Sequence, residues 1–384
     1  MDPLTQGVLG AAAPQAASRR FVVVAGLLGF ISGMTPDLDV FIRSDHDPIL
    51  FLEYHRQFTH SLVFIPLGGL ICAIVLHGLF AHRMLRFRDT LLYCTLGYAT
   101  HGLLDACTSY GTQLWWPFST VRVAWHNISI IDPLFTLPVL ALVVTAAVTR
   151  QPQWARLALV WGCLYLGFGV VQRERAEQVA ARLAESRGHA PATVEAKPSF
   201  GNLLVWKSIY EHAGYYYIDA IRVAATPLTY PGEHVRKLDV QRDFPWLDPA
   251  SQQARDVERF RWFSDGYLAR SATDEALIID MRYSILPNRG DGLWGVVLVP
   301  DAPSDAHVRY RTMRDTDAAT FNTLFAMVSN RADPGREPRV GEPCGTATTA
   351  AAQPCGEDQA ATTDRFRSPT TSSNSTTLPS GSRP

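Results

Sequence analysis

The sequence predicts an α-helical polytopic membrane domain, then a small β-rich or α+β soluble domain, and finally a disordered tail. Nearly all the long apolar runs fall in residues 1–171, whereas residues 172–384 hold most of the charge. Charged residues make up 18% of the chain, below the roughly 25% that is usual for soluble domains. The formal net charge of -1 gives no electrostatic reason to expect a nucleic-acid partner.

Six apolar segments are predicted in the membrane domain, and the first two are short. A bilayer core takes about 20 helical residues to cross, and the third and fifth segments reach that length. Fifteen helical residues reach only about 22 Å. We therefore expect the first two segments to form a re-entrant hairpin, or short helices where the bilayer is thinned and protein surrounds them. The second segment has a face of small residues for close helix packing. The segments are 3–17, 20–35, 61–80, 89–107, 130–149 and 155–171, and the small residues are Gly26, Gly29 and Gly33.

Arginines mark one side of the predicted membrane domain. They cluster in the turns after the first, third and fifth segments, which share a side if the segments alternate. The positive-inside rule places that side in the cytoplasm. We therefore expect a multi-pass protein of the bacterial inner membrane, with residues 36–60, residues 108–129 and both termini outside. The arginines are Arg19, Arg20, Arg83, Arg86, Arg88, Arg150 and Arg156, against Arg43, Arg56 and Arg122 in the opposite loops.

Beyond the last apolar segment the composition of the sequence changes, because long apolar runs give way to charged residues and short aromatic runs. Residues 172–198 are predicted as an amphipathic linker helix that leaves the membrane. Residues 199–330 carry short aromatic and β-branched runs between turn residues, which predicts an extracytoplasmic β-rich domain. Residues 331–384 are rich in Thr, Ser, Pro, Gly and Ala and are predicted to be disordered. The expected strands lie at 203–206, 215–218, 261–263, 276–279 and 294–299.

The ionisable groups of the membrane domain fall at the ends of apolar segments. PDLD at 36–39 ends the second segment, HRQFTHS at 55–61 opens the third, and His101 and Asp105 lie near the end of the fourth. The arginine-based topology places all three groups at the same outer face. Because that assignment used only arginine positions, the coincidence is independent support for one site.

These residue types favour a divalent-metal site. His101 and Asp105 are four residues apart, so they share one helical face, and together they offer half of a site for Zn²⁺ or Mn²⁺. Asp37 and Asp39 share a face if their stretch is extended, and His60 completes a mixed nitrogen and oxygen set. Such side chains are costly in a membrane unless they are paired or metal-bound, which favours a functional interpretation.

Simpler interpretations exist for each group on its own. His101 and Asp105 could hydrogen-bond to each other or to a neighbouring helix. The pair Asp37 and Asp39 could end a helix at the water interface, and His60 could be an ordinary interfacial histidine, as could His55. The convergence of three such groups favours the metal site.

Several further residues are expected to support the site. Gln6 lies at the outer end of the first segment, where it could donate a hydrogen bond into the site, and His55 is a candidate for the same supporting layer. Arg56 could hold an anionic substrate group or face lipid headgroups. Either Asp37 or Asp39 could act as a general base if it is not a metal ligand. Asp132 is expected to cap the fifth segment, because Pro133 follows it.

Residues 1–170 resemble the LexA-binding, inner membrane-associated hydrolase family, also described as membrane-bound metal-dependent hydrolases. The resemblance rests on MDPLTQ at 1–6, PDLD at 36–39, HRQFTHS at 55–61 and the stretch 101–113. It implies that the metal ligands are Asp37, Asp39, His60, His101 and Asp105. Some branches carry histidine where this chain has Gln6. The soluble portion is similar to an extension found in one branch, most clearly at WFS, 262–264.

Together the residues and the resemblance predict a metal-dependent hydrolase. Its location favours a lipid or small-molecule substrate such as an envelope phosphoester, with membrane lipid as the partner. Two alternatives stay open: a metal or proton transporter, because intramembrane Asp and His also mark ion pathways, and a non-catalytic envelope scaffold stabilised by a metal. The apolar cytoplasmic halves of the third and fourth segments disfavour transport.

Overall fold

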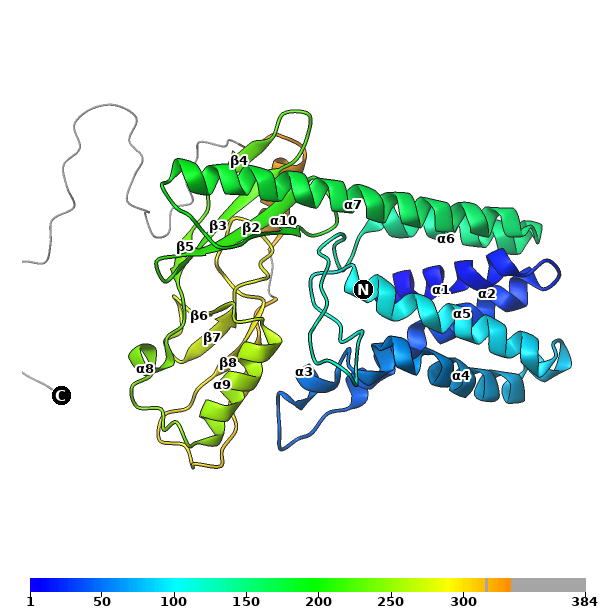
Figure 1. Ribbon diagram of the computed structural model, residues 1–384, viewed down its shortest axis with the longest axis horizontal. Coiled ribbons are helices and arrows are strands. Elements are labelled where there is room, and N and C mark those ends of the chain that lie inside the picture. Colours follow the sequence, from blue (N-terminus) through cyan, green and yellow to red (C-terminus); the bar gives the residue numbers. More distant parts are fainter. Residues whose placement is uncertain (315–316, 333–384) are drawn as a thin grey trace, which may run out of the picture. The chain divides into compact units, whose positions relative to one another are not determined.

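The protein is described here by a computed structural model that covers residues 1–314 and 317–332. These residues belong to one compact unit, in which a group of helices is followed by antiparallel sheets (Figure 1). Each of the six predicted apolar segments forms a helix. The helices are α1 (Pro3–Ala17), α2 (Val22–Met34), α4 (Ile65–Leu79), α5 (Phe87–Ala106), α6 (Pro133–Thr149) and α7 (Pro152–Ser186). The predicted tail, apart from residues 331 and 332, lies outside the described residues.

Three helical stretches are long and apolar enough to cross a membrane by length and composition, within residues 1–314 and 317–332. They are Val22–Phe41, Leu62–Leu79 and Pro152–Ser186. The predicted helical region is therefore confirmed and contains three candidate spans, whereas the crossing of the membrane by all six segments stays a prediction. The helix α6 is also apolar, but with 17 residues it is shorter than the three candidate spans.

The two N-terminal helices α1 and α2 pack closely, as the small residues predicted. A Cβ atom added at Gly29 would lie 2.3 Å from the Gly10 carbonyl oxygen, and one at Gly33 would lie 2.9 Å from the Gln6 carbonyl oxygen. Only glycine allows the backbones to approach so closely. The same packing brings Gln6 of α1 toward the end of α2, where the predicted site begins.

The longest helix, α7, differs from the predicted boundary between membrane segment and linker. It runs without interruption from Pro152 to Ser186, so the sixth apolar segment and most of the predicted linker 172–198 are one helix. Ala176, Ala180 and Ala184 are spaced four residues apart and are buried, which continues one packed helical face past the apolar run. The remainder of the predicted linker contains the first strand, β1 (Val194–Pro198).

The soluble region contains two antiparallel sheets. The first has the order β1-β2-β3-β4, and β5 also pairs with β3; the second has the order β6-β7-β8-β9. The predicted β-rich or α+β region is thus confirmed as antiparallel sheet with short helices. The further strands are β2 (Val205–His212), β3 (Tyr215–Arg222), β4 (Leu228–Tyr230), β5 (His234–Arg236), β6 (Leu268–Arg270), β7 (Leu277–Asp280), β8 (Trp294–Val297) and β9 (Arg309–Thr312). The helices of this region are α8 (Val240–Asp243), α9 (Gln252–Phe263) and α10 (Ala318–Val328).

One predicted strand is wrong. Residues 261–263 form the last turn of α9 and not a strand. The helix begins at Ser251, whose side chain accepts a hydrogen bond from the Ala254 amide. The buried residues Val257, Phe260 and Phe263 then recur every three residues, a helical spacing that the aromatic composition of the short run concealed.

The predicted cap of α6 is confirmed. Asp132 precedes the helix, and its side chain accepts hydrogen bonds from the amides of Leu134 and Phe135. The Tyr165 hydroxyl of α7 donates to the same carboxylate at 2.9 Å, and Asp132 is fully buried. The cap therefore also fastens α6 to α7.

We predict that Asp132→Ala lowers the stability of the protein by about 2 kcal/mol, because it removes a helix cap and leaves a hydroxyl without an acceptor. The apparent Tm in detergent measures the effect. Asp132→Asn keeps a capping oxygen and should recover most of the loss. Equal melting of the wild type and the alanine variant would contradict the role of this carboxylate.

Candidate metal centre

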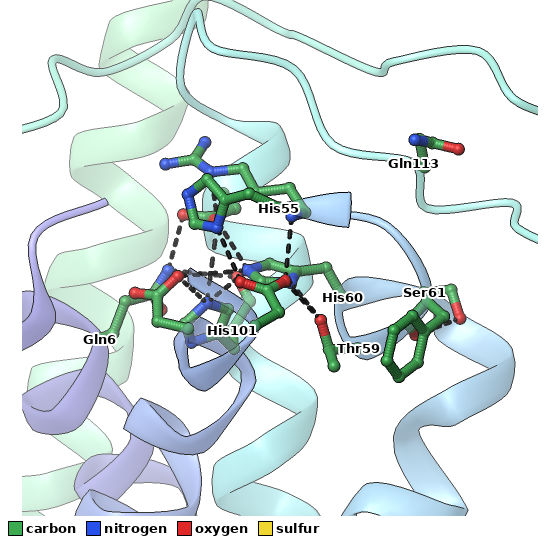
Figure 2. Close-up of polar contacts among 12 residues, drawn as sticks. Gln6, His55, Thr59, His60, Ser61, His101 and Gln113 are labelled. Atoms are coloured by element: carbon green, nitrogen blue, oxygen red, sulfur yellow. Dashed lines mark hydrogen bonds and ion pairs between the residues drawn. The ribbon is translucent and has the colours of Figure 1, made fainter. Parts of the chain in front are cut away.

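Four side chains from three separate elements meet at one point. One ligand atom from each of Asp37, His60, His101 and Asp105 lies within 4.8 Å of the other three. Asp37 comes from the 3₁₀-helix η1 (Thr35–Phe41), His60 from η2 (Phe58–His60), and the other two from α5. Figure 2 shows Gln6, His55, His60 and His101 gathered around this centre. The three stretches that the sequence analysis expected to converge do converge.

The four ligand atoms face one another. His101 Nε2 lies 2.9 Å from His60 Nε2 and 3.3 Å from Asp37 Oδ1. His60 Nε2 lies 3.3 Å from Asp105 Oδ2 and 3.4 Å from Asp37 Oδ1. Two imidazole nitrogens and two carboxylate oxygens thus surround a small common volume.

Burial gives this cluster a closed side and an open side. The side chains of His60, His101 and Asp105 are fully buried, whereas that of Asp37 is 22% exposed. Asp37 is therefore the member of the cluster through which a water molecule or a small ligand can reach it.

Asp39 lies behind His60 and not in front of it. Its Oδ2 is 3.2 Å from His60 Nδ1 and accepts a hydrogen bond from the Thr59 hydroxyl at 2.7 Å. A carboxylate at Nδ1 fixes the tautomer and orientation of a histidine whose Nε2 faces a metal. The extended stretch in which Asp37 and Asp39 share a face is not formed, because Pro36 sits in the first turn of a 3₁₀-helix, where its fixed φ fits.

His55 completes a second, overlapping group. Its Nδ1 lies 2.7 Å from Asp39 Oδ1, and Asp37, Asp39 and His55 also bring one ligand atom each within 4.8 Å of one another. His55 thus supports the site through Asp39, in the outer position that the sequence analysis expected. Direct metal ligation by Asp39 stays a prediction.

Gln6 and Arg56 both hold Asp105. Gln6 Nε2 donates to Asp105 Oδ1 at 2.8 Å, and Arg56 Nε lies 3.0 Å from Asp105 Oδ2. Arg56 Nη1 donates to the Thr108 hydroxyl, and its guanidinium stacks on the Tyr110 ring. Arg56 is only 4% exposed, so it does not face lipid headgroups. Its Nη2 has no acceptor within the part of the chain that the structure describes.

Charge compensation at the cluster involves His60. Burial disfavours a charge on this imidazole, but the carboxylates of Asp105, Asp37 and Asp39 outweigh burial and raise the pKa of His60 to about 10. Burial lowers the pKa of His55. Without a metal, the proton on His60 and the guanidinium of Arg56 therefore offset three nearby carboxylates, a role that a cation can also fill.

Two backbone contacts that support the cluster were not predicted from the sequence. The Gly33 carbonyl oxygen lies 2.5 Å from His101 Nδ1, which directs His101 Nε2 toward the centre. A Cβ atom added at Gly102 would lie 2.2 Å from the His60 carbonyl oxygen, so α5 touches the backbone of η2 here. The first contact could not be predicted, because every residue has a backbone carbonyl. The second could have been, because Gly102 is visible between the two ligands in the run HGLLD at 101–105.

Residues 1–176 match the family model described as YdjM inner membrane protein. This match covers every residue of the cluster and none of the sheets. Together with the apolar helices it supports a place in the inner membrane, and it agrees with the inner-membrane part of the resemblance seen in the sequence.

Two curated proteins are similar to parts of this chain. "Inner membrane protein YbcI" of Escherichia coli (strain K12) is 33% identical over 106 residues, which are 27% of this chain and 60% of the relative. "Uncharacterized protein YfhP" of Bacillus subtilis (strain 168) is 28% identical over 120 residues, 31% of this chain and 35% of the relative. The chain therefore covers less than two thirds of either relative. No solved structure matches the chain.

Proposed function

We propose that the helical region is a metal-dependent hydrolase that acts on a lipid or envelope phosphoester at the outer face of the inner membrane. The observation that carries this proposal is the convergence of Asp37, His60, His101 and Asp105, with ligand atoms within 4.8 Å of one another. Two imidazoles and two carboxylates form a donor set that suits Zn²⁺ or Mn²⁺.

The residues fit such an ion. Asp105 Oδ2 is buried and accepts no hydrogen bond in the described chain, although it lies 3.3 Å from His60 Nε2 and 3.7 Å from His101 Nε2. A divalent cation held by Asp37, His60, His101 and Asp105 would join Arg56 Nε, which lies 3.0 Å away, as a partner of this oxygen. The chemistry that such an ion supplies in hydrolases is activation of water and polarisation of the scissile group.

The surrounding residues have distinct roles in this proposal. Asp39 orients His60 through Nδ1. Asp37, on the open side, accepts a proton from the attacking water if it is not a ligand. Arg56 offers Nη2 to an anionic substrate group. The outer-face orientation, with the sheets extracytoplasmic, rests on the arginine distribution.

The test is hydrolysis by the full chain purified in detergent. Phosphodiester and phospholipid substrates are supplied with Zn²⁺ or Mn²⁺, and bound metal is measured by elemental analysis. We expect His101→Ala to lose both metal and activity, while His82→Ala, which alters a histidine far from the cluster in sequence and hydrogen-bonded only to the His77 carbonyl, keeps both. Activity unchanged in His101→Ala would reject the proposal.

A structural metal centre is the second candidate, because three of the four ligands are fully buried and structural sites have four protein ligands. In that case chelation should lower the Tm of a protein that hydrolyses none of the substrates. Metal or proton transport stays untested, and uptake into proteoliposomes tests it.

We predict that metal affinity rises with pH. The pKa of His60 is about 10 without metal, so at neutral pH this imidazole must lose a proton before Nε2 can bind a cation. Affinity should therefore increase about tenfold per pH unit between about pH 7 and pH 9, with one proton released per ion. Competition with a fluorescent chelator measures this slope. A flat profile would mean that His60 is not a ligand.

A further inference from the structure

A small cavity lined by apolar and cationic side chains contains none of the four metal ligands. It has a volume of about 100 Å³ and lies between the chain after α5, the chain before α6, and the sheets. Its lining includes three cationic residues and no Asp or Glu. At about 30 Å³ for a liquid water molecule, the volume suits a few waters or one tetrahedral oxyanion. The polar lining consists of Ser109, Ser129, Lys197, Ser199, Lys207, Arg282 and Ser284.

Lys207 is a buried cation without an anionic partner. It is 4% exposed, and its Nζ donates to the Ser284 hydroxyl at 2.8 Å and to the Arg289 carbonyl at 2.9 Å. Both acceptors are neutral, and the ammonium has a third hydrogen to donate. No carboxylate lies within ion-pair distance of it in residues 1–314 and 317–332. Asp291, Asp280 and Glu233 stabilise this ammonium only from beyond ion-pair distance. Because a buried ammonium without a close counterion is unfavourable, an anion in the cavity would stabilise it further.

Three other groups in the lining also have unused donors. Arg282 binds Asp280 and the Phe263 carbonyl through Nε and Nη2, which leaves Nη1 without an acceptor among the described residues. The Ser109 hydroxyl is buried and has no hydrogen-bond partner there. The Lys197 ammonium is paired with Glu195, and its two other hydrogens have no acceptor among the described residues. Four side chains with unused donors therefore line one cavity.

We propose that this cavity binds one phosphate group, held by Lys207, Arg282, Lys197 and the Ser109 hydroxyl. A tetrahedral oxyanion presents four acceptor atoms to donors that come from several directions, and it also places a negative charge in direct contact with Lys207. Water molecules would satisfy the donors but not the charge. The group is either free inorganic phosphate or the headgroup of a phosphomonoester lipid.

Burial lowers the pKa of Lys207 to about 8, so the ammonium is still mostly protonated at pH 7 and can attract an anion. The proposal does not depend on hydrolysis. Ser109 lies four residues after Asp105, and the Tyr283 hydroxyl donates to its carbonyl, so a bound phosphate would tie the end of α5 to the second sheet.

The test measures binding of inorganic phosphate to the full chain in detergent by calorimetry and by Tm, with chloride at matched ionic strength. We expect saturable binding and a higher Tm with phosphate only. Lys207→Met should weaken binding by roughly tenfold to a hundredfold, as expected for hydrogen bonds to a charged group. Lys237→Met is the matched control, because Lys237 is partly exposed and pairs with Glu211. Lys207→Met should keep the metal content of the wild type, which separates this site from the metal centre.

A second arm identifies the source of the phosphate group. Dihexanoyl phosphatidic acid is compared with dihexanoyl phosphatidylcholine. Binding of inorganic phosphate without phosphatidic acid assigns the free ion, and binding of phosphatidic acid without phosphatidylcholine assigns the lipid headgroup; either result supports the proposal. If Lys207→Met does not fold, Ser109→Ala replaces it and should weaken binding severalfold. The proposal is overturned if the wild type binds neither ligand, or if binding is the same in the cavity variants as in the wild type.

Discussion

Asp105→Ala is expected to destabilise the protein by about 3–5 kcal/mol, the largest effect of any single change to the cluster. The Asp105 carboxylate contacts Gln6 Nε2, Arg56 Nε and His60 Nε2, and the Met1 amino group also bonds to it. Its removal leaves the buried guanidinium of Arg56 without a counterion. The same change removes a proposed metal ligand, so metal content should fall as well.

Thermal melting and elemental analysis of the same preparation test this expectation. Asp89→Ala is the matched control, because Asp89 is on the same helix but is 37% exposed and forms a loose ion pair, 3.8 Å long, with the exposed Arg88. This change should alter the stability by less than about 0.5 kcal/mol. Asp105→Asn keeps the shape of the side chain and should recover part of the packing but not the metal. Normal melting of Asp105→Ala would show that Arg56 has another counterion.

Gly102→Ala is expected to spread the cluster without removing any of its side chains. The added Cβ would lie 2.2 Å from the His60 carbonyl oxygen, so either α5 or η2 must move. Such overpacking costs about 1–3 kcal/mol. A displacement of about 1 Å between His60 and His101 can cost on the order of a hundredfold in a function that depends on their geometry.

Gly78→Ala is the control for this change, because a Cβ atom there would contact nothing within 4 Å. It lies in α4 and should leave Tm and metal binding unchanged. Tm, metal affinity and hydrolysis are measured on both variants. Wild-type metal affinity in Gly102→Ala would mean that the close approach of α5 to η2 does not hold the cluster together.

The sequence predicted the site better than its internal arrangement. The spacing of His101 and Asp105 placed them on one helical face, and the arginine pattern placed them at the same end as residues 36–39 and 55–61. Helix periodicity and loop charge carry that information over long stretches. The structure brings these groups together as expected.

The sequence did not predict which side of His60 each aspartate occupies. Asp37 and Asp39 lie in a 3₁₀-helix of 7 residues, and so short an element has no periodicity by which to assign faces. The same limit explains the wrong strand at 261–263, since three aromatic or basic residues fit either structure. The unbroken α7 was missed because the large apolar residues on its exposed face end at Val171, whereas its buried face continues with the small residues Ala176, Ala180 and Ala184.

The continuity of α7 has a mechanical consequence. Its 35 residues reach about 52 Å, well beyond a hydrocarbon core of about 30 Å, and no proline or glycine interrupts residues 170–186. Gln172 donates from this helix to the Leu203 and Val223 carbonyls beside the first sheet. The helix is therefore one continuous rod between the apolar helices and the first sheet, so any change in its tilt against the neighbouring helices would move that sheet with it.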